Sequence, residues 1–480
     1  LQSDSAKQPM QLDQLLRPNL ELPLKPSKLH QPIGMTVSQR SWNEAVELPN
    51  KPIEQFPVRI KSDLNETRNI QFVAQKGQVL SFELHSAGLD QLTDPALVLY
   101  KVNPPPKPDA PPQLQQVAEQ DDAPGLGTAA VKIRQIDPKL VWTAPDAATY
   151  QLQIIDRQSG NRPVDSRGFL LEIRQAQPSF SLLAHQVFPT NNPATSRPWG
   201  AQLTKNGSLQ IHVSVLRHDG FAGAIELSVE GLPAGAKCSN VIIPAGVNEA
   251  DIIIQGAAEM DASLASVSIV GTAKIGEQQS QVRAAFATIA SAAIPTYNAV
   301  SSRRSGSLNV QLSSADLAPL QVQLGDGNPL EVKAGAKFNL PVKLIRQAGS
   351  AAECTLRPQS LPPKIALGEF KIAPDKAESA PEINVPADAA PGEYTFWLQT
   401  ETKVKWRSNP QALAREEAYQ AKLKSALEAN STGDIPKAQV EAVAAKVAAR
   451  IEELKKQTAE VEYTLFLPSN PIRLRILPKD

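Results

Sequence analysis

The sequence predicts a mainly β protein of three β-sandwiches, with an α-helical hairpin inserted near the C-terminus. Three observations support this fold class. Many short runs alternate between apolar and polar residues, as strands with one buried face do. Proline is abundant, at 41 of 480 residues, which suits many loops and few long helices. Only one segment, close to the C-terminus, is rich in strong helix formers.

The length and charge of the chain limit its domain count and its partners. A chain of 480 residues is too long for one hydrophobic core and predicts about two to four domains. Its 49 basic and 49 acidic residues cancel, so no net field attracts nucleic acid or an anionic membrane, and we expect no nucleic-acid partner. No apolar run approaches the roughly 20 residues that span a bilayer, so we expect no transmembrane segment.

Residues 1–55 predict an extended, proline-rich N-terminal arm. Prolines interrupt any regular element there, at Pro9, Pro18, Pro23, Pro26, Pro32, Pro49 and Pro52. The arm also carries more leucines than a freely solvated tail would, at Leu12, Leu15, Leu16, Leu20, Leu22 and Leu24. We therefore expect the arm to pack on its own domains or on a neighbouring subunit.

Residues 56–177 predict the first β-sandwich, of roughly a hundred residues. Alternating runs such as NIQFVAQKGQVLSFELHS and TYQLQIIDR are typical of half-buried strands. Ile70 and Phe72 precede the Lys76-Gly77 turn and Phe82 follows it, which predicts an antiparallel hairpin. Residues 101–127 contain a cluster of prolines, so we expect a long exposed loop there and no strand.

Two further sandwiches are predicted at 178–292 and 318–480, with a linker at 293–317. The two modules form an internal repeat, because LQIHVSVLRHDGFAGAIELSVEGLP aligns with FNLPVKLIRQAGSAAECTLRPQSLP. The alignment places Arg217 over Arg346, and it places His218 and Asp219 opposite residues of different chemistry. Shared features of a duplicated fold belong to its architecture. We therefore interpret His218-Asp219 as a polar turn rather than half of a catalytic site.

Residues 410–460 predict a helical hairpin inserted into the last sandwich. One helix carries an apolar stripe at three- and four-residue steps, formed by Val440, Val443, Val447, Ile451 and Leu454. Leu413, Leu423 and Leu427 supply a matching face on the other helix. Asp434 is expected to cap the second helix, with Pro436 in its first turn. The stripe is interpreted as the seam between the two helices, or alternatively as an exposed docking surface.

Several motifs carry a resemblance to known families. The order NIQFVAQKGQVLSFEL, LTDPALVLY, EQDD, LVWTAPDAATYQLQIIDR and RGFLLEI resembles the bacterial pre-peptidase C-terminal (PPC) domain over residues 56–175. HDGF followed by GLPAG, and the later WRSNP, resemble tandem immunoglobulin-like domains of large secreted planctomycete proteins over 178–480. This resemblance implies a PPC-like β-sandwich followed by two immunoglobulin-like β-sandwiches, and little about chemistry.

The candidate chemistry is limited to one cation site. HExxH, paired CxxC, GxSxG and P-loop motifs are all missing, and the five histidines (His30, His85, His185, His212 and His218) are too scattered for a local metal site. We therefore expect no enzyme activity, no catalytic residue and no cofactor-binding residue. Loop carboxylates in the first sandwich could bind Ca²⁺, or could be solvated turn residues, and they are Asp94, Asp121, Asp122 and Asp156.

Aromatic and cysteine residues add few functional signals. Trp142 and Trp397 sit in strand-like runs and are expected in hydrophobic cores, whereas Trp199 in SRPWG is a candidate surface contact. A carbohydrate platform usually needs more than one ring, so we expect no carbohydrate ligand. Cys238 and Cys354 fall in different predicted domains and are expected to be free thiols, with a disulfide as the alternative.

Two hypotheses for function follow. The first is a non-catalytic structural or interaction protein, located in the secreted, periplasmic or cell-surface space, that assembles with itself or with a protein partner through the arm and the sandwich surfaces. The alternative is the accessory region of a secreted hydrolase or peptidase whose catalytic domain is absent from this chain. Because the chain begins at Leu1 rather than Met, we expect that a signal peptide or a larger N-terminal region has been removed.

Overall fold

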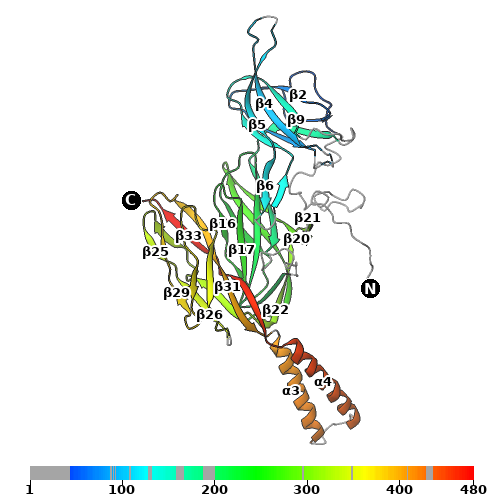
Figure 1. Cartoon of the computed structure of the whole chain (residues 1–480), viewed down its shortest axis with the longest axis vertical. Coiled ribbons are helices and arrows are strands. Elements are labelled where there is room, and N and C mark those ends of the chain that lie inside the picture. Colours follow the sequence, from blue (N-terminus) through cyan, green and yellow to red (C-terminus); the bar gives the residue numbers. More distant parts are fainter. Residues whose placement is uncertain are drawn as a thin grey trace.

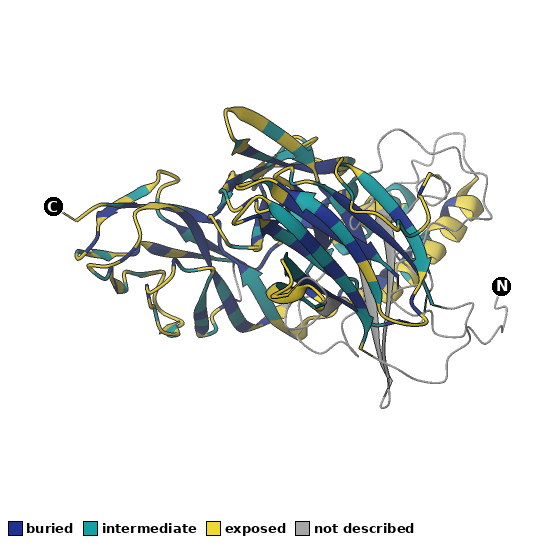
Figure 2. Cartoon of the chain, turned by 90° about the horizontal axis from the view of Figure 1, so that it is seen from above, coloured by how far each residue is buried: buried dark blue, intermediate teal, exposed yellow. Residues whose placement is uncertain are grey.

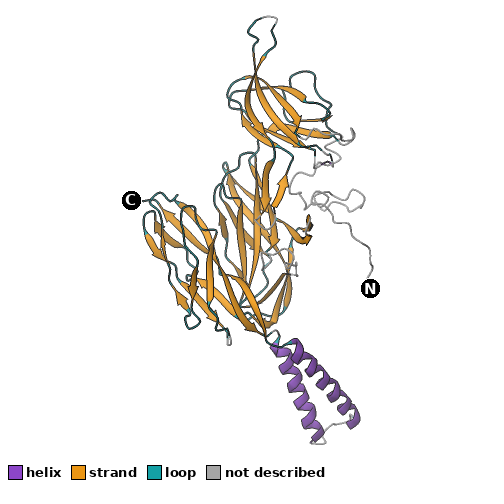
Figure 3. Cartoon of the chain, viewed as in Figure 1, coloured by secondary structure: helices purple, strands orange, loops and turns teal. Residues whose placement is uncertain are grey.

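The structure is a computed structural model, and it confirms a mainly β protein with one helical hairpin (Figure 3). Three β-sheet domains are present, which we name domain 1 (β1–β10), domain 2 (β11–β22) and domain 3 (β23–β33). The described residues are 44–86, 89, 91, 93–107, 110–127, 132–157, 167–187, 201–294, 297–347, 350–407, 409–428 and 436–479. Domain 1 lies at one end of the long axis, domains 2 and 3 lie side by side, and the helices project from the other end (Figure 1).

Domain 1 is a sandwich of two four-stranded antiparallel sheets. Its strands are β1 (Val58–Asp63), β2 (Arg68–Ala74), β3 (Val79–His85), β4 (Pro95–Asn103), β5 (Gln113–Gln120), β6 (Ala123–Gly127), β7 (Lys132–Gln135), β8 (Lys139–Thr143), β9 (Ala148–Asp156) and β10 (Gly168–Gln175). One sheet has the order β1-β10-β3-β8 and the other β2-β9-β4-β5, while β6 and β7 form a separate hairpin. The β6–β7 hairpin extends toward domain 2 and contacts it (Figure 1).

The predicted hairpin around Lys76-Gly77 is wrong, because β2 and β3 belong to different sheets. The chain crosses from one sheet to the other at this turn, where Gly77 has a positive φ of 79°. Phe72 and Phe82 both point into the space between the sheets, and their ring centroids lie 5.3 Å apart. Alternation alone identifies both strands, but it cannot distinguish a hairpin within one sheet from an arch between two sheets.

The predicted loop at 101–127 is also wrong in part. Residues Gln113–Gln120 form β5, which pairs with β4 at the edge of its sheet, and β6 covers Ala123–Gly127. The described prolines of this cluster, Pro104–Pro106 and Pro111–Pro112, lie between β4 and β5. The eight residues of β5 follow this cluster and contain no proline. A strand at the edge of a sheet also pairs on one side only, so prolines next to it do not prevent it from forming.

The end of the predicted arm lies against domain 1. Val46 forms an isolated parallel bridge to Ile60 of β1, and Ile53 forms another to Phe72 of β2. These two strands are the edges of the two sheets, so residues 44–56 run along one open side of the sandwich. Residues 1–43 of the arm lie outside the described residues.

Domain 2 is a sandwich of two larger sheets. Its strands are β11 (Ser179–Gln186), β12 (Ala201–Lys205), β13 (Ser208–His218), β14 (Ile225–Glu230), β15 (Ala236–Cys238), β16 (Val241–Ile243), β17 (Glu249–Gly256), β18 (Ser263–Ile275), β19 (Gln278–Arg283), β20 (Ala285–Ile294), β21 (Tyr297–Ser305) and β22 (Leu308–Leu317). One sheet has the order β15-β17-β13-β11-β20-β21 and the other β12-β22-β18-β14-β16, with β19 paired to β18. Ile211, Val213 and Val215 of β13 face the core, as the alternation predicts.

The predicted linker at 293–317 is wrong. This segment supplies the end of β20 and all of β21 and β22, which are paired strands of domain 2. The connection to domain 3 consists only of Ala318 and Pro319, between β22 and β23. The segment is rich in small and polar residues. It therefore lacks the clear alternation of apolar and polar residues from which strands are predicted.

Domain 3 repeats the plan of domain 2 and contains the helices. Its strands are β23 (Leu320–Leu324), β24 (Leu330–Lys333), β25 (Lys337–Asn339), β26 (Val342–Arg346), β27 (Cys354–Gln359), β28 (Phe370–Ile372), β29 (Glu378–Ser379), β30 (Glu382–Asn384), β31 (Gly392–Trp406), β32 (Val461–Pro468) and β33 (Ile472–Leu477). The sheets are β23-β26-β29, β25-β30 and β24-β33-β31-β27-β28, with β32 paired to β31.

Matching hydrogen bonds confirm the internal repeat. Arg217 is the last residue but one of β13 and donates to the carbonyl oxygens of Gly223 and Pro244, six and 27 residues further along the chain. Arg346 ends β26 and donates to the carbonyl oxygens of Ala352 and Ala373, also six and 27 residues further along. Each guanidinium therefore holds the same two loop segments in its own domain, as the alignment of the two arginines predicts.

The helices α3 (Pro410–Glu428) and α4 (Lys437–Gln457) pack against each other in the connection between β31 and β32. In α4, Val440, Val447, Ile451 and Leu454 are buried, whereas Val443 is 39% exposed and departs from the predicted stripe. Pro436 precedes α4 as its N-cap residue instead of lying in its first turn, and Asp434 lies outside the described residues. Most of the hairpin surface is exposed (Figure 2).

Candidate functional site

The His218-Asp219 pair, predicted to be a polar turn, lies at the junction of domains 1 and 2. Asp219 follows the last residue of β13 and adopts a positive φ of 54°, so the chain does turn at this residue. Its side chain is buried against domain 1, and the whole residue is only 4% exposed. The pair therefore acts in an interdomain contact in addition to forming a turn.

Asp219 accepts hydrogen bonds from three elements near the domain boundary. Ser81 of β3 donates through Oγ to Asp219 Oδ1 (2.9 Å), and the backbone N–H of Gln177 donates to Oδ2 (2.8 Å). The guanidinium of Arg174 on β10 contacts both carboxylate oxygens. An aspartate that accepts this many bonds is fixed in one rotamer, so its own domain is held to domain 1.

A second acid and a second base complete the charged cluster. Lys139 Nζ on β8 lies 3.4 Å from Asp219 Oδ1 and also pairs with Glu83 of β3. Glu83 Oε1 in turn accepts from Arg174 (3.0 Å). Two carboxylates and two cations alternate in space, so each buried charge has an opposite neighbour. We call Glu83, Lys139, Arg174 and Asp219 the junction cluster.

The environment sets the charge of both members of the pair. Burial acts to raise the pKa of Asp219, but the hydrogen bond from Arg174, the N–H of Gln177 and the charge of Lys139 outweigh it and lower this pKa to about 2. Burial and the Lys139 ammonium lower the pKa of His218 below its usual range. Asp219 is therefore ionised and His218 neutral near pH 7.

The hydrogen bonds of His218 do not activate a nucleophile. The Lys139 ammonium can only donate, so His218 Nδ1 accepts its hydrogen bond (3.3 Å) and the ring proton is on Nε2. His218 Nε2 then donates to Ser181 Oγ (3.0 Å), the reverse of the bond that a general base makes to a serine. The carboxylate of Asp219 meanwhile faces Arg174 and Ser81. These residues lack the geometry of a Ser-His-Asp triad.

The junction of domains 2 and 3 is built from smaller contacts. The backbone N–H of Ile242 in β16 donates to Thr395 Oγ1 of β31 (3.0 Å). Arg473 Nη2 lies 3.2 Å from Glu226 of domain 2, and its Nη1 lies 3.7 Å from Glu393. Trp397 is buried on the same side of β31 as Thr395, opposite the core residues Phe396 and Leu398. Its expected burial is confirmed, but it lies outside the core cluster of domain 3.

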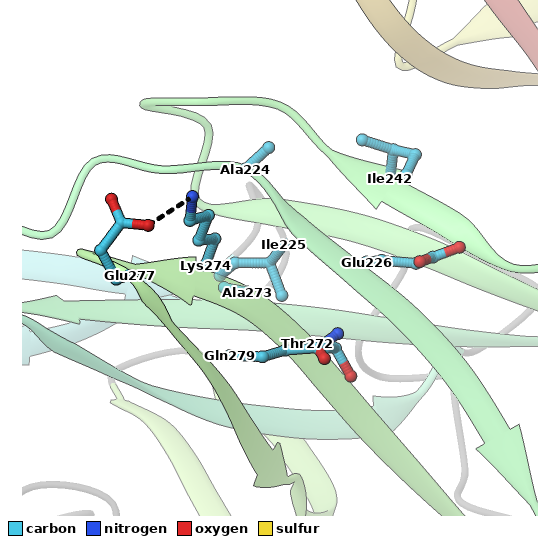
Figure 4. Close-up of a pocket in the computed structure, with 9 residues that line it drawn as sticks. All are labelled: Ala224, Ile225, Glu226, Ile242, Thr272, Ala273, Lys274, Glu277 and Gln279. Carbon is cyan, nitrogen blue, oxygen red and sulfur yellow. Dashed lines mark ion pairs between the residues drawn. The ribbon is translucent and has the colours of Figure 1, made fainter.

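Two surface hollows of the described residues offer little chemistry. A depression of about 400 Å³ on domain 2 is lined by β14, β18 and β19, and its rim carries an ion pair between Lys274 and Glu277 of 3.3 Å (Figure 4). A second hollow of about 300 Å³ lies between domains 2 and 3 beside Thr395, Asn470 and Arg473. The side chains of Asn470 and Arg473 already make hydrogen bonds within the protein.

The structure brings together three of the four carboxylates proposed for calcium. Asp94, Asp121 and Asp122 place one oxygen each within 4.8 Å of one another. Asp156 adjoins them, because its Oδ1 accepts the backbone N–H of Asp94 (3.0 Å). Arg157 reaches within 3.9 Å of Asp121 and supplies a positive charge nearby. Loop oxygens of this kind fit Ca²⁺, and exposed carboxylates also gather in loops without any ion.

Other predicted residues are placed as follows. Cys238 and Cys354 are free, as expected, and burial raises the pKa of the Cys238 thiol to about 12, so this thiol is unreactive. Trp142 is buried in the core of domain 1, where its ring lies 4.6 Å from that of Tyr150. Trp199 lies outside the described residues. In the part of the chain that the structure describes, neither helix is apolar enough over a sufficient length to cross a bilayer.

Sequence reasoning missed the partners of Asp219. Glu83, Lys139 and Arg174 come from three different strands of domain 1, and no local motif links them. Their signal is that they are charged residues in otherwise apolar strands, such as FELH and FLLEIRQ. Charged residues in a strand indicate only an outward face, so they do not reveal that a second domain covers it.

Comparisons with known proteins give no family. No protein family and no curated protein sequence matches the chain. Among solved structures, one similarity is to the crystal structure described as "Putative membrane anchored protein from Corynebacterium diphtheriae", at 9% identity and a TM-score of 0.17, covering 91% of each chain. This similarity is too low to support an argument about function.

Proposed function

We propose that the chain is a non-catalytic structural or interaction protein of the secreted, periplasmic or cell-surface space. It assembles with copies of itself or with a protein partner through its N-terminal arm and the surfaces of its sandwiches. In this proposal domain 1 is a PPC-like sandwich, and domains 2 and 3 are immunoglobulin-like sandwiches of the kind that secreted planctomycete proteins carry in tandem. The observation that carries the proposal is the way the three domains are joined.

The joints between domains favour a stiff body over flexibly tethered modules. Only Ala176, Gln177 and Pro178 separate β10 from β11, and only Ala318 and Pro319 separate β22 from β23. Each connection ends in proline, which restricts the backbone just before the next strand. The junction cluster and the Ile242–Thr395 contact add side-chain bonds at the two joints. A rigid body of this form suits a spacer or scaffold, which must hold its ends at a fixed separation.

Local features support the proposed sandwich types. Tyr394 lies near the start of β31, and its hydroxyl donates to the carbonyl oxygen of Ala390, four residues upstream (3.1 Å). Tyr150 near the start of β9 makes the equivalent bond to Asp146 (2.9 Å). A tyrosine that bonds back to the preceding corner is a feature of immunoglobulin-like sandwiches, so the bond of Tyr394 supports this type for domain 3.

The described end of the arm suggests how assembly occurs. The N–H of Val46 donates to Arg59 (2.9 Å), and that of Ile53 donates to Gln71 (2.8 Å), so this segment already adds itself to sheet edges by backbone bonds. Residues 1–43 continue from this point with leucines and prolines. We infer that they add to an edge of a neighbouring subunit in the same way.

The test is the mass of the native particle, measured by light scattering for the intact chain and for a variant that lacks residues 1–43. The truncation keeps residues 44–56, so domain 1 retains the contacts described above. We expect an assembly from the intact chain, whose single copy has a mass of 51.7 kDa, and a folded monomer lighter than that from the truncated chain. A monomer in both cases would reject assembly through the arm and favour the accessory region of a hydrolase. An assembly that survives truncation would reject the arm as the connector.

A further inference from the structure

Two buried histidines lie side by side in the β15-β17-β13-β11-β20-β21 sheet of domain 2. They are on the face of the sheet that points away from the core between the two sheets. His185 of β11 is directly opposite His212 of β13, and His212 is directly opposite Asp251 of β17. The two imidazole centroids are 5.1 Å apart. His185 is only 8% exposed and His212 only 5%. Sequence separation hides this pair, because 26 residues lie between the two histidines and the strand register alone joins them.

Each ring has one nitrogen held by an acceptor. His212 Nδ1–H donates to Asp251 Oδ1 (3.1 Å), and His185 Nδ1–H donates to the carbonyl oxygen of Gln186 (3.2 Å). Nε2 is then the nitrogen of each ring that is left for a further ligand. A carboxylate or carbonyl that fixes Nδ1–H is the arrangement that orients histidine ligands in metal sites.

The free nitrogen of His212 is the observation that calls for a ligand. His212 Nε2 is buried and has no hydrogen-bond partner within the described parts of the chain. The nearest carboxylate oxygen, Oε2 of Glu249 on β17, lies 3.6 Å away, beyond hydrogen-bond range. A buried ring nitrogen without a partner costs free energy that a metal ion at this place would recover.

We propose that His185 Nε2, His212 Nε2 and the carboxylate of Glu249 bind a zinc ion on this face of domain 2. Zinc favours neutral imidazole with one carboxylate, and a water would occupy the fourth position of its tetrahedron. Asp251 acts as a positioning residue that holds His212 in the ligating tautomer. Since the site lies in one domain, its zinc stabilises that domain whether or not the chain assembles.

The ligand atoms need a small side-chain movement to converge on one ion. Side-chain rotation must complete the site, because only Asp94, Asp121 and Asp122 among the described residues already hold three ligand atoms within 4.8 Å of one another. The side chain of Glu249 is 57% exposed and free to rotate toward the two rings.

The experiment titrates zinc chloride into the metal-free full chain and follows binding by calorimetry and the melting temperature. We expect one site of micromolar or tighter affinity, a melting temperature that rises with zinc, and no comparable response to Ca²⁺. The visible spectrum of bound Co²⁺ should indicate tetrahedral coordination. His212→Asn should abolish the tight site.

A second variant, Glu249→Gln, tests the proposal even if the buried His212→Asn variant fails to fold. Glu249 is exposed, so its variant should fold normally and lose at least tenfold in zinc affinity. Glu277→Gln, the same change at a still more exposed glutamate of the same domain, is the control and should bind zinc like the parent chain. Absence of a tight site in the parent overturns the proposal, and so does a site that survives both His212→Asn and Glu249→Gln. Zinc binding that is lost only in an Asp121→Asn variant would place the ion at the domain 1 carboxylates and also overturn it.

Discussion

At the scale of single residues, Asp219 has the most stringent role that the structure assigns. Its carboxylate pairs with both cations of the junction cluster, Lys139 and Arg174. Asp219→Ala should leave Lys139 and Arg174 short of a counter-charge and lower the free energy of unfolding by roughly 2–4 kcal/mol. Urea denaturation measures this change. Asp388→Ala, which removes an exposed pair with Lys364, is the control and should lower the free energy of unfolding far less. Equal effects of the two variants would contradict the role of Asp219.

The pKa of Asp219 predicts how this contribution depends on pH. The folded pKa is about 2, below the ordinary value of 3.8, so the unfolded chain binds the proton more readily as the pH falls. The stabilisation is complete above about pH 4 and is lost progressively down to about pH 2, by roughly 1–2 kcal/mol. Asn does not titrate, so the difference in unfolding free energy between the parent and Asp219→Asn should shrink over this range. A difference that stays constant from pH 5 to pH 2 would contradict the assignment.

The two repeated arginines make a paired prediction. Arg217 donates to the carbonyl oxygens of Gly223 (2.6 Å) and Val247 (2.7 Å), and Arg346 to that of Ala352 (2.6 Å). Arg217→Ala and Arg346→Ala should each lower the free energy of unfolding by roughly 2–4 kcal/mol, because partly buried carbonyl oxygens lose their hydrogen-bond donor. Lysine should rescue neither, since it lacks the planar fork. Arg475→Ala, which removes an exposed pair with Glu331, is the control for calorimetric melting. A large loss in one domain with none in the other would contradict the repeat.

At the scale of elements, the two related domains show where the helical hairpin was inserted. In domain 2, β18 and β19 are joined by Gly276 and Glu277 alone, with Ile275 opposite Gln278. In domain 3, β31 and β32 close on the pair Trp406 and Val461, and α3 and α4 occupy the connection. The helices thus replace a two-residue turn at the tip of an equivalent strand pair.

This equivalence predicts that the hairpin can be removed. Replacing residues 407–460 by Asn-Gly restores a tight turn between β31 and β32, since this dipeptide favours the hairpin turn type. We expect the helical circular dichroism signal to disappear and the unfolding free energy of the sandwiches to change by at most about 1 kcal/mol. The parent chain is the reference for both measurements. Aggregation, or loss of the β-sheet signal, would show instead that the helices are needed to fold domain 3.

The sequence was informative about elements and less so about their connections. Alternation identifies β2, β3 and β13, and residue composition identifies α3 and α4, because burial on one face leaves a local pattern. The partner of a strand is a nonlocal property, so the arch at Gly77 and the strands β21 and β22 were missed. The candidate sites follow the same rule. Three of the predicted calcium carboxylates do gather, whereas the junction cluster and the His185–His212 pair depend on domain contact and strand register.

At the scale of the whole molecule, function depends on whether the two joints are stiff. Each joint combines a short connection that ends in proline with a cross-domain contact, but the contacts differ in kind. The joint between domains 1 and 2 is a buried charged cluster, and the joint between domains 2 and 3 includes a half-exposed arginine, Arg473, between Glu226 and Glu393. The second joint is therefore the easier one to open by a single substitution.

Small-angle X-ray scattering can test this stiffness directly. The monomeric chain lacking residues 1–43 should scatter as one elongated rigid body that matches the arrangement of the three domains in Figure 1.

Arg473→Glu places three carboxylates together, so repulsion should separate domain 3 from domain 2 and give the scattering of two bodies that move independently. Arg475→Glu, two residues along the same strand and paired with Glu331 inside domain 3, is the matched control and should leave the curve unchanged. If Arg473→Glu also leaves the curve unchanged, the ion pairs of Arg473 do not hold this joint, and its stiffness must come from the Ala318-Pro319 connection and from other contacts such as the Ile242–Thr395 bond. If the parent chain already scatters as independent modules, the proposal of a rigid scaffold is wrong.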